Sequence, residues 1–214
     1  MIRAVIFDMD GVLFDTEQLG NQILKEAAQA LGHTIEDDVI RKTIGVSLQA
    51  GKQVFLNAYG ENFPYDDIIS LWTRQMTQHM EENGMPLKPG LLETLEALKK
   101  KGLPYAIATS NNEAIVKRYL SFSRLENAFD AMVCGDQIKN SKPFPDIYIT
   151  AAKALKIPPE ECMGVEDSIN GVKAVRAAGM TCVMIPDQLP YTPDLAPYVD
   201  HCVPSLIDLI PLIG

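Results

Sequence analysis

Short apolar runs rich in β-branched residues recur along this chain, and the stretches between them carry the apolar spacing of amphipathic helices. The runs lie at 4–7, 105–109, 131–134, 162–165, 181–185 and 201–203. Leu91–Lys101 is one of the helical stretches, and it ends in three lysines before Gly102, as the carboxyl ends of helices prefer. Because strands that alternate with helices of this length join parallel neighbours, the sequence predicts an α/β fold with a doubly wound parallel sheet.

One region breaks this alternation. Between about residues 16 and 83 only helical patterns occur, and the segment 83–89 that follows is rich in Gly and Pro, as linkers are. We therefore expect an all-helical domain, residues 15–85, inserted into an α/β core domain formed by residues 1–14 and 86–214.

Composition and charge narrow the class of protein. The 214 residues carry a formal net charge of −9 without a cluster of Lys and Arg, which argues against a nucleic-acid partner. No run approaches the ~18 apolar residues of a membrane span, and only four apolar residues precede Asp8, too few for the core of a signal peptide. We expect a cytoplasmic monomer that binds neither nucleic acid nor membrane.

Polar residues follow four of the apolar runs at their carboxyl ends, where open α/β sheets bind ligands. Each of them has a structural alternative when taken alone: Ser110 could cap a helix, and Lys142 could be a solvated loop charge. Their joint order along the chain favours one shared site. The candidates are Asp8, Asp10, Ser110, Asn111, Lys142, Glu166 and Asp167.

The motifs DMDGV, TSN, SKPFPD and GVEDS occur in the order typical of one family. On these motifs the chain resembles the haloacid dehalogenase superfamily, in the branch that includes β-phosphoglucomutase-like enzymes and sugar-phosphate phosphatases. The resemblance covers nearly the whole length. It implies a Rossmann-like core whose inserted helical domain acts as a cap that closes over the core and excludes water.

The resemblance also implies roles for the two acids of DMDGV. Asp8 resembles the nucleophile, which attacks phosphorus and forms an aspartyl-phosphate. Asp10 resembles the general acid and base, which protonates the leaving oxygen and then activates water. The backbone carbonyl of Asp10 joins the metal shell in the family.

The remaining motifs imply a metal site and a phosphate site. Asp8, Asp10, Glu166 and Asp167 resemble the family's ligands for Mg²⁺, with Asp167 the surer direct ligand. Ser110, Asn111 and Lys142 resemble the residues that hold the phosphoryl group. Mg²⁺ and Lys142 together offset three of the about five negative charges that meet there when substrate is bound.

Departures from the family's pattern narrow the reaction. Dehalogenases and phosphonatases resemble this chain but lack an aspartate at the position of Asp10, so we expect neither activity. β-Phosphoglucomutases carry an arginine after G-V-S, where this chain has Leu48, and a histidine near the position of Leu19 or Gly20; an uncharged leucine does not grip a second phosphate.

We therefore expect a phosphatase that acts on a small phosphorylated metabolite, most plausibly a sugar phosphate. A β-phosphoglucomutase-type mutase remains the main alternative, and a non-catalytic phospho-receiver-like signalling domain is a weaker one. Four residues of the predicted cap could face the substrate, although residues of this kind are more often solvated helix charges or amides: Arg41, Lys42, Gln49 and Lys52.

Overall fold

The computed structural model describes residues 1–43 and 48–213, and the chain forms two compact units. One unit joins Met1–Asp15 to Met85–Gly214 and contains the sheet, and the other is Thr16–Gly84. We call the second the helical unit. Its described helices are α1 (Thr16–Ala30), α2 (Asp37–Arg41), α3 (Leu48–Tyr59) and α4 (Tyr65–Asn83). The boundaries predicted for the two domains, and the action of this unit as a cap, stay predictions.

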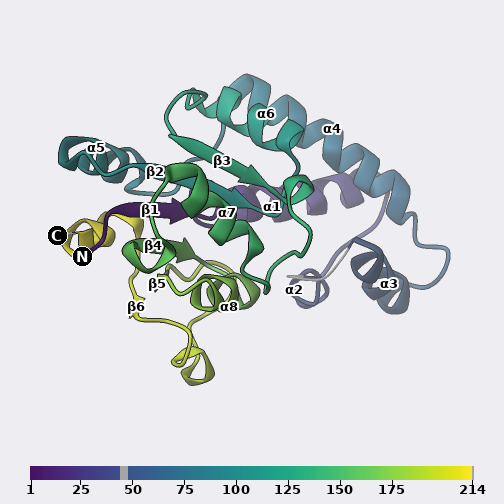
Figure 1. Ribbon diagram of the computed structural model, residues 1–214. Coiled ribbons are helices and arrows are strands. Elements are labelled where there is room, and N and C mark those ends of the chain that lie inside the picture. Colours follow the sequence, from purple (N-terminus) through teal and green to yellow (C-terminus); the bar gives the residue numbers. More distant parts are fainter. Residues whose placement is uncertain (44–47, 214) are drawn as a thin grey trace. The chain divides into compact units, whose positions relative to one another are not determined.

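The sheet has six parallel strands in the order β3-β2-β1-β4-β5-β6 (Figure 1). From β1 the chain adds two strands on one side, then crosses over and adds three on the other, so the predicted doubly wound α/β fold is confirmed. The strands are β1 (Ala4–Phe7), β2 (Tyr105–Thr109), β3 (Ala131–Cys134), β4 (Cys162–Glu166), β5 (Thr181–Met184) and β6 (His201–Cys202).

Helices cover the sheet because its strands are apolar on both sides. Along β1, Ala4 and Ile6 belong to one core cluster with residues of two helices, while Val5 and Phe7 point to the opposite face and are equally buried. The helices of this unit are α5 (Leu91–Lys101), α6 (Glu113–Ser123), α7 (Asp146–Leu155) and α8 (Ile169–Ala177), with short 3₁₀ turns η1 (Gly135–Gln137), η2 (Pro159–Glu161), η3 (Pro193–Leu195) and η4 (Leu206–Ile213).

Two of these helices pack on the sheet and fix the position of the polar loops at the carboxyl ends of its strands. Helix α7 packs on β1, β2 and β3, and α8 packs on β4 and β5. The Ser168 hydroxyl accepts a hydrogen bond from the Gly171 backbone N–H, which caps the amino end of α8 directly after β4. The loop between β4 and α8 is therefore short and fixed at both ends.

The chain leaves the sheet-containing unit and returns to it at one place. Phe14 and Leu87 form an antiparallel bridge, the Asp15 N–H donates to the Pro86 carbonyl oxygen at 2.9 Å, and the Lys88 N–H donates to that of Leu13 at 2.9 Å. We call this paired segment the crossing; it comprises residues 13–15 and 86–88. Both connections to the helical unit are thus anchored in the same short ladder.

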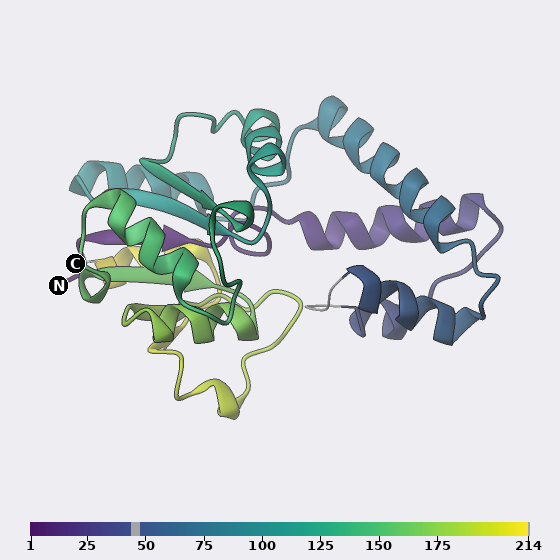
Figure 2. The ribbon, with the colours of Figure 1, turned by 45° about the vertical axis from the view of Figure 1, so that its right-hand side comes forward.

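The helical unit has its own core. Helices α1 and α4 pack side by side (Figure 2), and the Trp72 indole N–H donates to the Gly20 carbonyl oxygen at 2.8 Å. Phe55 and Phe63 stack with ring centroids 6.0 Å apart. Among the helices that the structure describes, none combines the length and the apolar character needed to cross a membrane.

Candidate active site

The site begins where the central strands end. Asp8 directly follows β1, and its backbone N–H donates to the Val165 carbonyl oxygen at 2.9 Å, which keeps it beside the end of β4. Glu166 is the last residue of β4, and Asp167 follows it. The chain turns away from β1 and β4 in opposite directions, and such a switch point is where open α/β sheets bind ligands.

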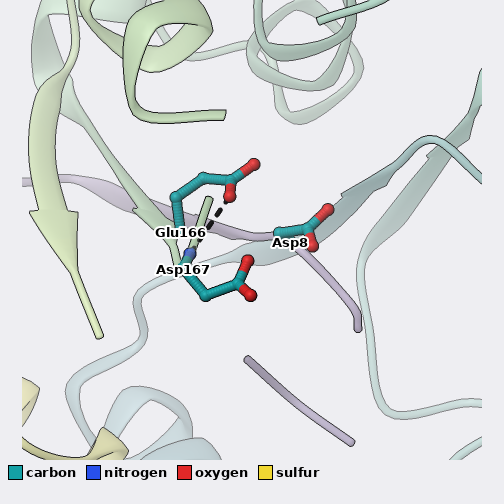
Figure 3. A group of neighbouring side chains, drawn as sticks. All are labelled: Asp8, Glu166 and Asp167. Atoms are coloured by element: carbon teal, nitrogen blue, oxygen red, sulfur yellow. Dashed lines mark hydrogen bonds between the residues drawn. The ribbon is translucent and has the colours of Figure 1, made fainter. Parts of the chain in front are cut away.

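Three carboxylates meet at this point (Figure 3). Asp8, Glu166 and Asp167 each place a carboxylate oxygen within 4.8 Å of the other two. Glu166 is fully buried and Asp8 is 9% exposed. Like charges at about 5 Å repel by roughly 3 kcal/mol per pair at an effective dielectric constant of 20, so this group requires positive charge close to it.

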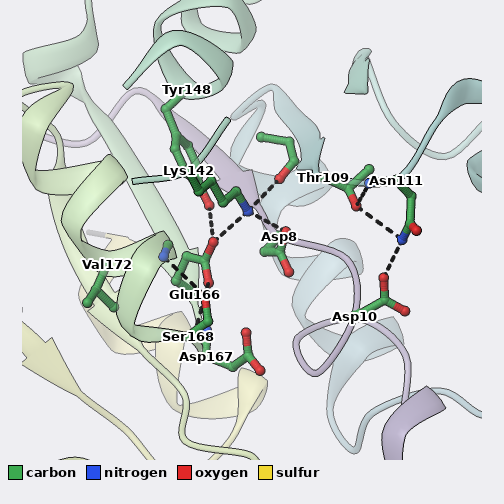
Figure 4. A network of polar contacts seen from close by, with 12 residues as sticks. Asp8, Asp10, Thr109, Asn111, Lys142, Tyr148, Glu166, Asp167, Ser168 and Val172 are labelled. Carbon is green, nitrogen blue, oxygen red and sulfur yellow. Dashed lines mark hydrogen bonds and ion pairs between the residues drawn. The ribbon is translucent and has the colours of Figure 1, made fainter. Parts of the chain in front are cut away.

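Lys142 supplies one such charge (Figure 4). Its Nζ lies 2.5 Å from Asp8 Oδ1 and 2.6 Å from Glu166 Oε1, and it also donates to the Ala108 carbonyl oxygen at 3.1 Å. The ammonium group thereby has an acceptor for each of its three hydrogens. Burial alone would lower the pKa of Lys142, but the charges of Asp8 and Glu166 outweigh burial and raise that pKa above its usual value.

Glu166 is held by hydrogen bonds on both carboxylate oxygens. Oε1 accepts from Lys142 and from the Tyr148 hydroxyl at 2.8 Å, and Oε2 accepts from the Asp167 N–H at 3.1 Å and from the N–H and hydroxyl of Ser168 at 3.2 and 3.0 Å. Burial acts to raise the pKa of Glu166, yet the charge and hydrogen bonds of Lys142, with those of Tyr148 and Ser168, hold it below its usual range. The residue is an ionised anchor for Lys142.

Asp8 differs from Glu166 in the balance of the same forces. Burial raises the pKa of Asp8 to about 7; Lys142 opposes this rise, and the negative charge of Glu166 adds to it. One lysine shared between two carboxylates therefore favours ionisation of Glu166 more than that of Asp8.

Asp10 is placed by a neutral partner. The Asn111 side-chain N–H₂ donates to Asp10 Oδ2 at 2.5 Å, and the backbone of Asn111 is itself fixed, because its N–H donates to Thr109 Oγ1 at 3.2 Å and its carbonyl accepts from the Gly135 N–H at 2.8 Å. Burial, with a contribution from the charge of Asp10, raises the pKa of the Tyr119 hydroxyl to about 12. The two aspartates of the DMDGV motif thus meet different partners.

The predicted residues fall into two groups and one outlier. Lys142 joins Asp8 and Glu166, with Asp167 beside them, while Asp10 pairs with Asn111. Ser110 is exposed beyond the end of β2, and its backbone carbonyl oxygen lies 2.2 Å from the place that a Cβ atom on Gly135 would occupy. Its role and the roles of the other six residues stay predictions.

The sequence patterns gave no role to Tyr148, which lies on the buried face of α7. At helical spacing with Ile147, Ala151 and Ala152 it is typical of a core aromatic ring, and it is indeed fully buried. The hydroxyl was the available signal, because a buried tyrosine hydroxyl needs a hydrogen-bond partner. Here that partner is Glu166.

Two of the residues that could face the substrate have partners within the helical unit. Lys42 Nζ lies 3.2 Å from Asp38 Oδ2, and Lys52 Nζ lies 2.6 Å from Asp66 Oδ2 and over the ring of Tyr65. The motif Gly45-Val46-Ser47 lies outside the described residues, and so does the side chain of Leu48.

The chemistry of the three-carboxylate group fits a hard divalent cation. All of its donor atoms are carboxylate oxygens, which Mg²⁺ prefers, and no softer ligand such as His or Cys belongs to the group. Because both oxygens of Glu166 are engaged by protein donors, Asp8 and Asp167 are the members best suited to contact a cation directly.

Comparison with known proteins identifies the family of this chain. The profile of the haloacid dehalogenase-like hydrolase family matches residues 5–185. The phosphorylated carbohydrates phosphatase of Thermotoga maritima is 36% identical over 184 residues, which are 84% of this chain and 82% of the relative. Hexitol phosphatase B of Escherichia coli is 29% identical over 187 residues, 86% of this chain and 84% of the relative.

Solved structures agree with the family match. CbbY from Rhodobacter sphaeroides, crystallised as a mutant in complex with xylulose-(1,5)bisphosphate, superimposes with a TM-score of 0.75 at 27% identity, covering 98% of this chain and 96% of that one. The chain belongs to the haloacid dehalogenase-like hydrolase family.

Proposed function

We propose that this protein is a Mg²⁺-dependent phosphatase that hydrolyses a small phosphorylated metabolite, of the sugar-phosphate class, through an aspartyl-phosphate on Asp8. One observation carries the proposal: Asp8 shares Lys142 with Glu166, while Asp10 accepts a hydrogen bond from the neutral amide of Asn111. Two carboxylates in different environments suit two different chemical roles. The named activities of the relatives from Thermotoga maritima and Escherichia coli support the same choice.

The first half of the reaction transfers the phosphoryl group to the enzyme. An oxygen of ionised Asp8 forms a bond to phosphorus as the bond from phosphorus to the ester oxygen breaks. Asp10 gives its proton to that oxygen, and the metabolite leaves as an alcohol. The amide of Asn111 holds Asp10 in one orientation for this transfer.

The second half releases the phosphate. Asp10, now ionised, takes a proton from a water molecule whose oxygen bonds to phosphorus, and the bond between phosphorus and Asp8 breaks. Inorganic phosphate leaves, Asp8 is again a carboxylate and Asp10 is again protonated. The same residue thus acts first as an acid and then as a base.

Asp8 and Asp167 would hold Mg²⁺ through their side chains, and Asp10 through its backbone carbonyl. A bound Mg²⁺ supplies positive charge that lowers the repulsion between the carboxylates and an anionic phosphate. Glu166 would contribute by fixing Lys142 and the loop before α8, since five hydrogen bonds occupy its two oxygens. Lys142, Ser110 and the backbone near Asn111 would orient the phosphoryl oxygens.

A paired assay tests the proposal against the mutase alternative. Purified protein with Mg²⁺ is screened for release of inorganic phosphate from hexose and pentose monophosphates. In parallel, β-glucose 1-phosphate with a bisphosphate activator is followed through glucose 6-phosphate dehydrogenase. We expect phosphate release from at least one sugar phosphate and no comparable rate in the coupled assay. Rapid coupled turnover with background phosphate release would establish the mutase and refute the phosphatase.

A further inference from the structure

Another carboxylate, that of Asp187, lies at the same edge of the sheet. Asp187 follows β5, the strand next to β4, and the chain there runs along the site because the Ile185 N–H donates to the Glu166 carbonyl oxygen at 2.8 Å. Its side chain is 10% exposed. No motif of the sequence singled it out, since Pro-Asp after a strand is typical of any turn.

One oxygen of Asp187 is paired and the other is not. Oδ1 lies 2.6 Å from the ammonium nitrogen of Lys88. Oδ2 is buried and has no hydrogen-bond partner among the described residues. A buried carboxylate oxygen without a donor is costly, so its position calls for a ligand or an ordered water.

Gly11 shows where this unpaired oxygen points. A Cβ atom on Gly11 would lie 2.3 Å from Asp167 Oδ2 and 3.3 Å from Asp187 Oδ2, so both oxygens border one small space above Gly11. Gly11 has φ +74°, a backbone conformation that glycine adopts without strain. The absence of a side chain at this position keeps the two carboxylates open to the same space.

Lys88 fixes Asp187 in this orientation. Its Nζ also lies 3.3 Å from Asp15 Oδ1, and both Lys88 and Asp15 belong to the crossing. Their backbones are tied by the ladder around the Phe14–Leu87 bridge. Asp187 Oδ1 is therefore held by a lysine whose backbone is anchored, and Oδ2 borders the space that it shares with Asp167 Oδ2.

We propose that Asp187 belongs to the cation site, where Oδ2 accepts a hydrogen bond from a water molecule in the shell of the divalent cation held by Asp8 and Asp167. This inference rests on the proposed function, because it requires the Mg²⁺ site. Mg²⁺ retains several waters in protein sites, and those waters donate hydrogen bonds to carboxylates around the ion. Asp187 is a positioning residue and does not touch the substrate.

The test compares Mg²⁺ binding in three full-length proteins. Asp187→Asn keeps the shape of the side chain but replaces one acceptor oxygen with a donor. Glu160→Gln is the matched control: it also removes one negative charge, but Glu160 is exposed in η2, before the amino end of β4 and hence at the other edge of the sheet. Dissociation constants for Mg²⁺ are measured by calorimetry after removal of metal with EDTA, and the rise in melting temperature with Mg²⁺ is a second readout.

We expect Asp187→Asn to bind Mg²⁺ about tenfold more weakly than wild type, and Glu160→Gln to stay within about twofold of it. Asp187→Ser serves as the second variant: it replaces the carboxylate with a shorter hydroxyl instead of an amide, and we expect the same weakening of Mg²⁺ binding. An affinity for Mg²⁺ in both Asp187 variants equal to that of the control overturns the inference, and would mean that Oδ2 pairs with an ordinary bound water. Absence of Mg²⁺ binding to wild type would instead refute the proposed metal site itself, and the inference with it.

Discussion

Gly171 provides the space in which the carboxylate of Glu166 lies. A Cβ atom on Gly171 would be 1.8 Å from Glu166 Cδ and 1.9 Å from Oε1, distances that no pair of unbonded atoms can adopt. Gly171 is in the first turn of α8, and Ser168 caps that turn through the Gly171 N–H. The helix therefore approaches the strand closely enough to enclose the carboxylate on one side.

The first prediction concerns this close approach. Gly171→Ala must displace either α8 or Glu166, so we expect a loss of about 1–3 kcal/mol in the free energy of unfolding and a fall in phosphate release of at least about tenfold. Urea denaturation and a p-nitrophenyl phosphate assay measure the two effects. The matched control is Gly51→Ala in α3, where the added Cβ would meet, among the described residues, only Thr43 at 3.8 Å.

The control separates the effect of the contact from the general effect of replacing glycine in a helix. Gly51→Ala is expected to leave stability unchanged or to raise it by up to about 1 kcal/mol, since alanine favours helices. If Gly171→Ala behaved like Gly51→Ala in both measurements, the tight enclosure of Glu166 would not exist in solution.

The second prediction concerns pH and the metal-free protein. Burial raises the pKa of Asp8 from 3.8 to about 7, so in that range the folded state holds a proton that the unfolded state has released. The free energy of unfolding is therefore expected to fall as pH rises from about 4 to about 7, by up to about 4 kcal/mol for a shift of this size. Urea denaturation in EDTA at about pH 5, 6 and 7 measures it.

Asp8→Asn is the control for this titration. Glu166 acts in the other direction: because its pKa is lowered, its contribution to stability is present above its unfolded value of 4.5 and is lost as pH falls below that value. All other side chains are common to the two proteins, so the difference between wild type and Asp8→Asn isolates Asp8. A difference that stays constant from about pH 5 to 7 would contradict the raised pKa.

The third prediction concerns the nucleophile. Asp8→Asn should remove essentially all phosphate release, because an amide cannot form the aspartyl-phosphate. The protein should remain folded by circular dichroism, since the side chain keeps its shape and one buried negative charge is lost. Retention of turnover near the wild-type level would rule out the covalent route through Asp8.

The fourth prediction concerns the cation. EDTA is expected to abolish hydrolysis of p-nitrophenyl phosphate, and added Mg²⁺ to restore it. Ca²⁺ should restore it poorly, because its larger and looser coordination changes the spacing of the oxygens around it. Full activity after exhaustive chelation would show that the three-carboxylate group does not hold a required metal.

The sequence was sufficient to predict the parallel, doubly wound architecture of the sheet. Strands 4–7, 105–109 and 131–134 have the predicted bounds, because each is a short apolar run bounded by polar or turn residues. β4 ends one residue later than predicted, at Glu166, whose carboxylate is buried in the fold. From sequence alone, a charged residue at the end of an apolar run is assigned to the following loop, because the partners that allow it to be buried are not known.

The partners of the site residues could not be predicted from sequence. The link from Tyr148 to Glu166 depends on how α7 lies on the sheet, and the link from Lys88 to Asp187 joins residues 99 positions apart. The expected substrate binding by Asn111 stays a prediction, and the hydrogen bond that its amide donates to Asp10 was not foreseen. Motif order identifies which strand ends carry polar groups, but packing decides which of these groups touch.

The crossing has a consequence for how such a chain can diverge. Because the chain enters and leaves the helical unit next to the Phe14–Leu87 bridge, this unit is a single insertion between β1 and α5. We expect substitutions, insertions or wholesale exchange within 16–84 to leave the register of β1 and its neighbours unchanged, since no described residue of that segment belongs to a strand of the sheet. Under the proposed function, sequence change in the insert would therefore leave Asp8, Lys142 and Glu166 in place, as long as the ladder at the crossing is kept.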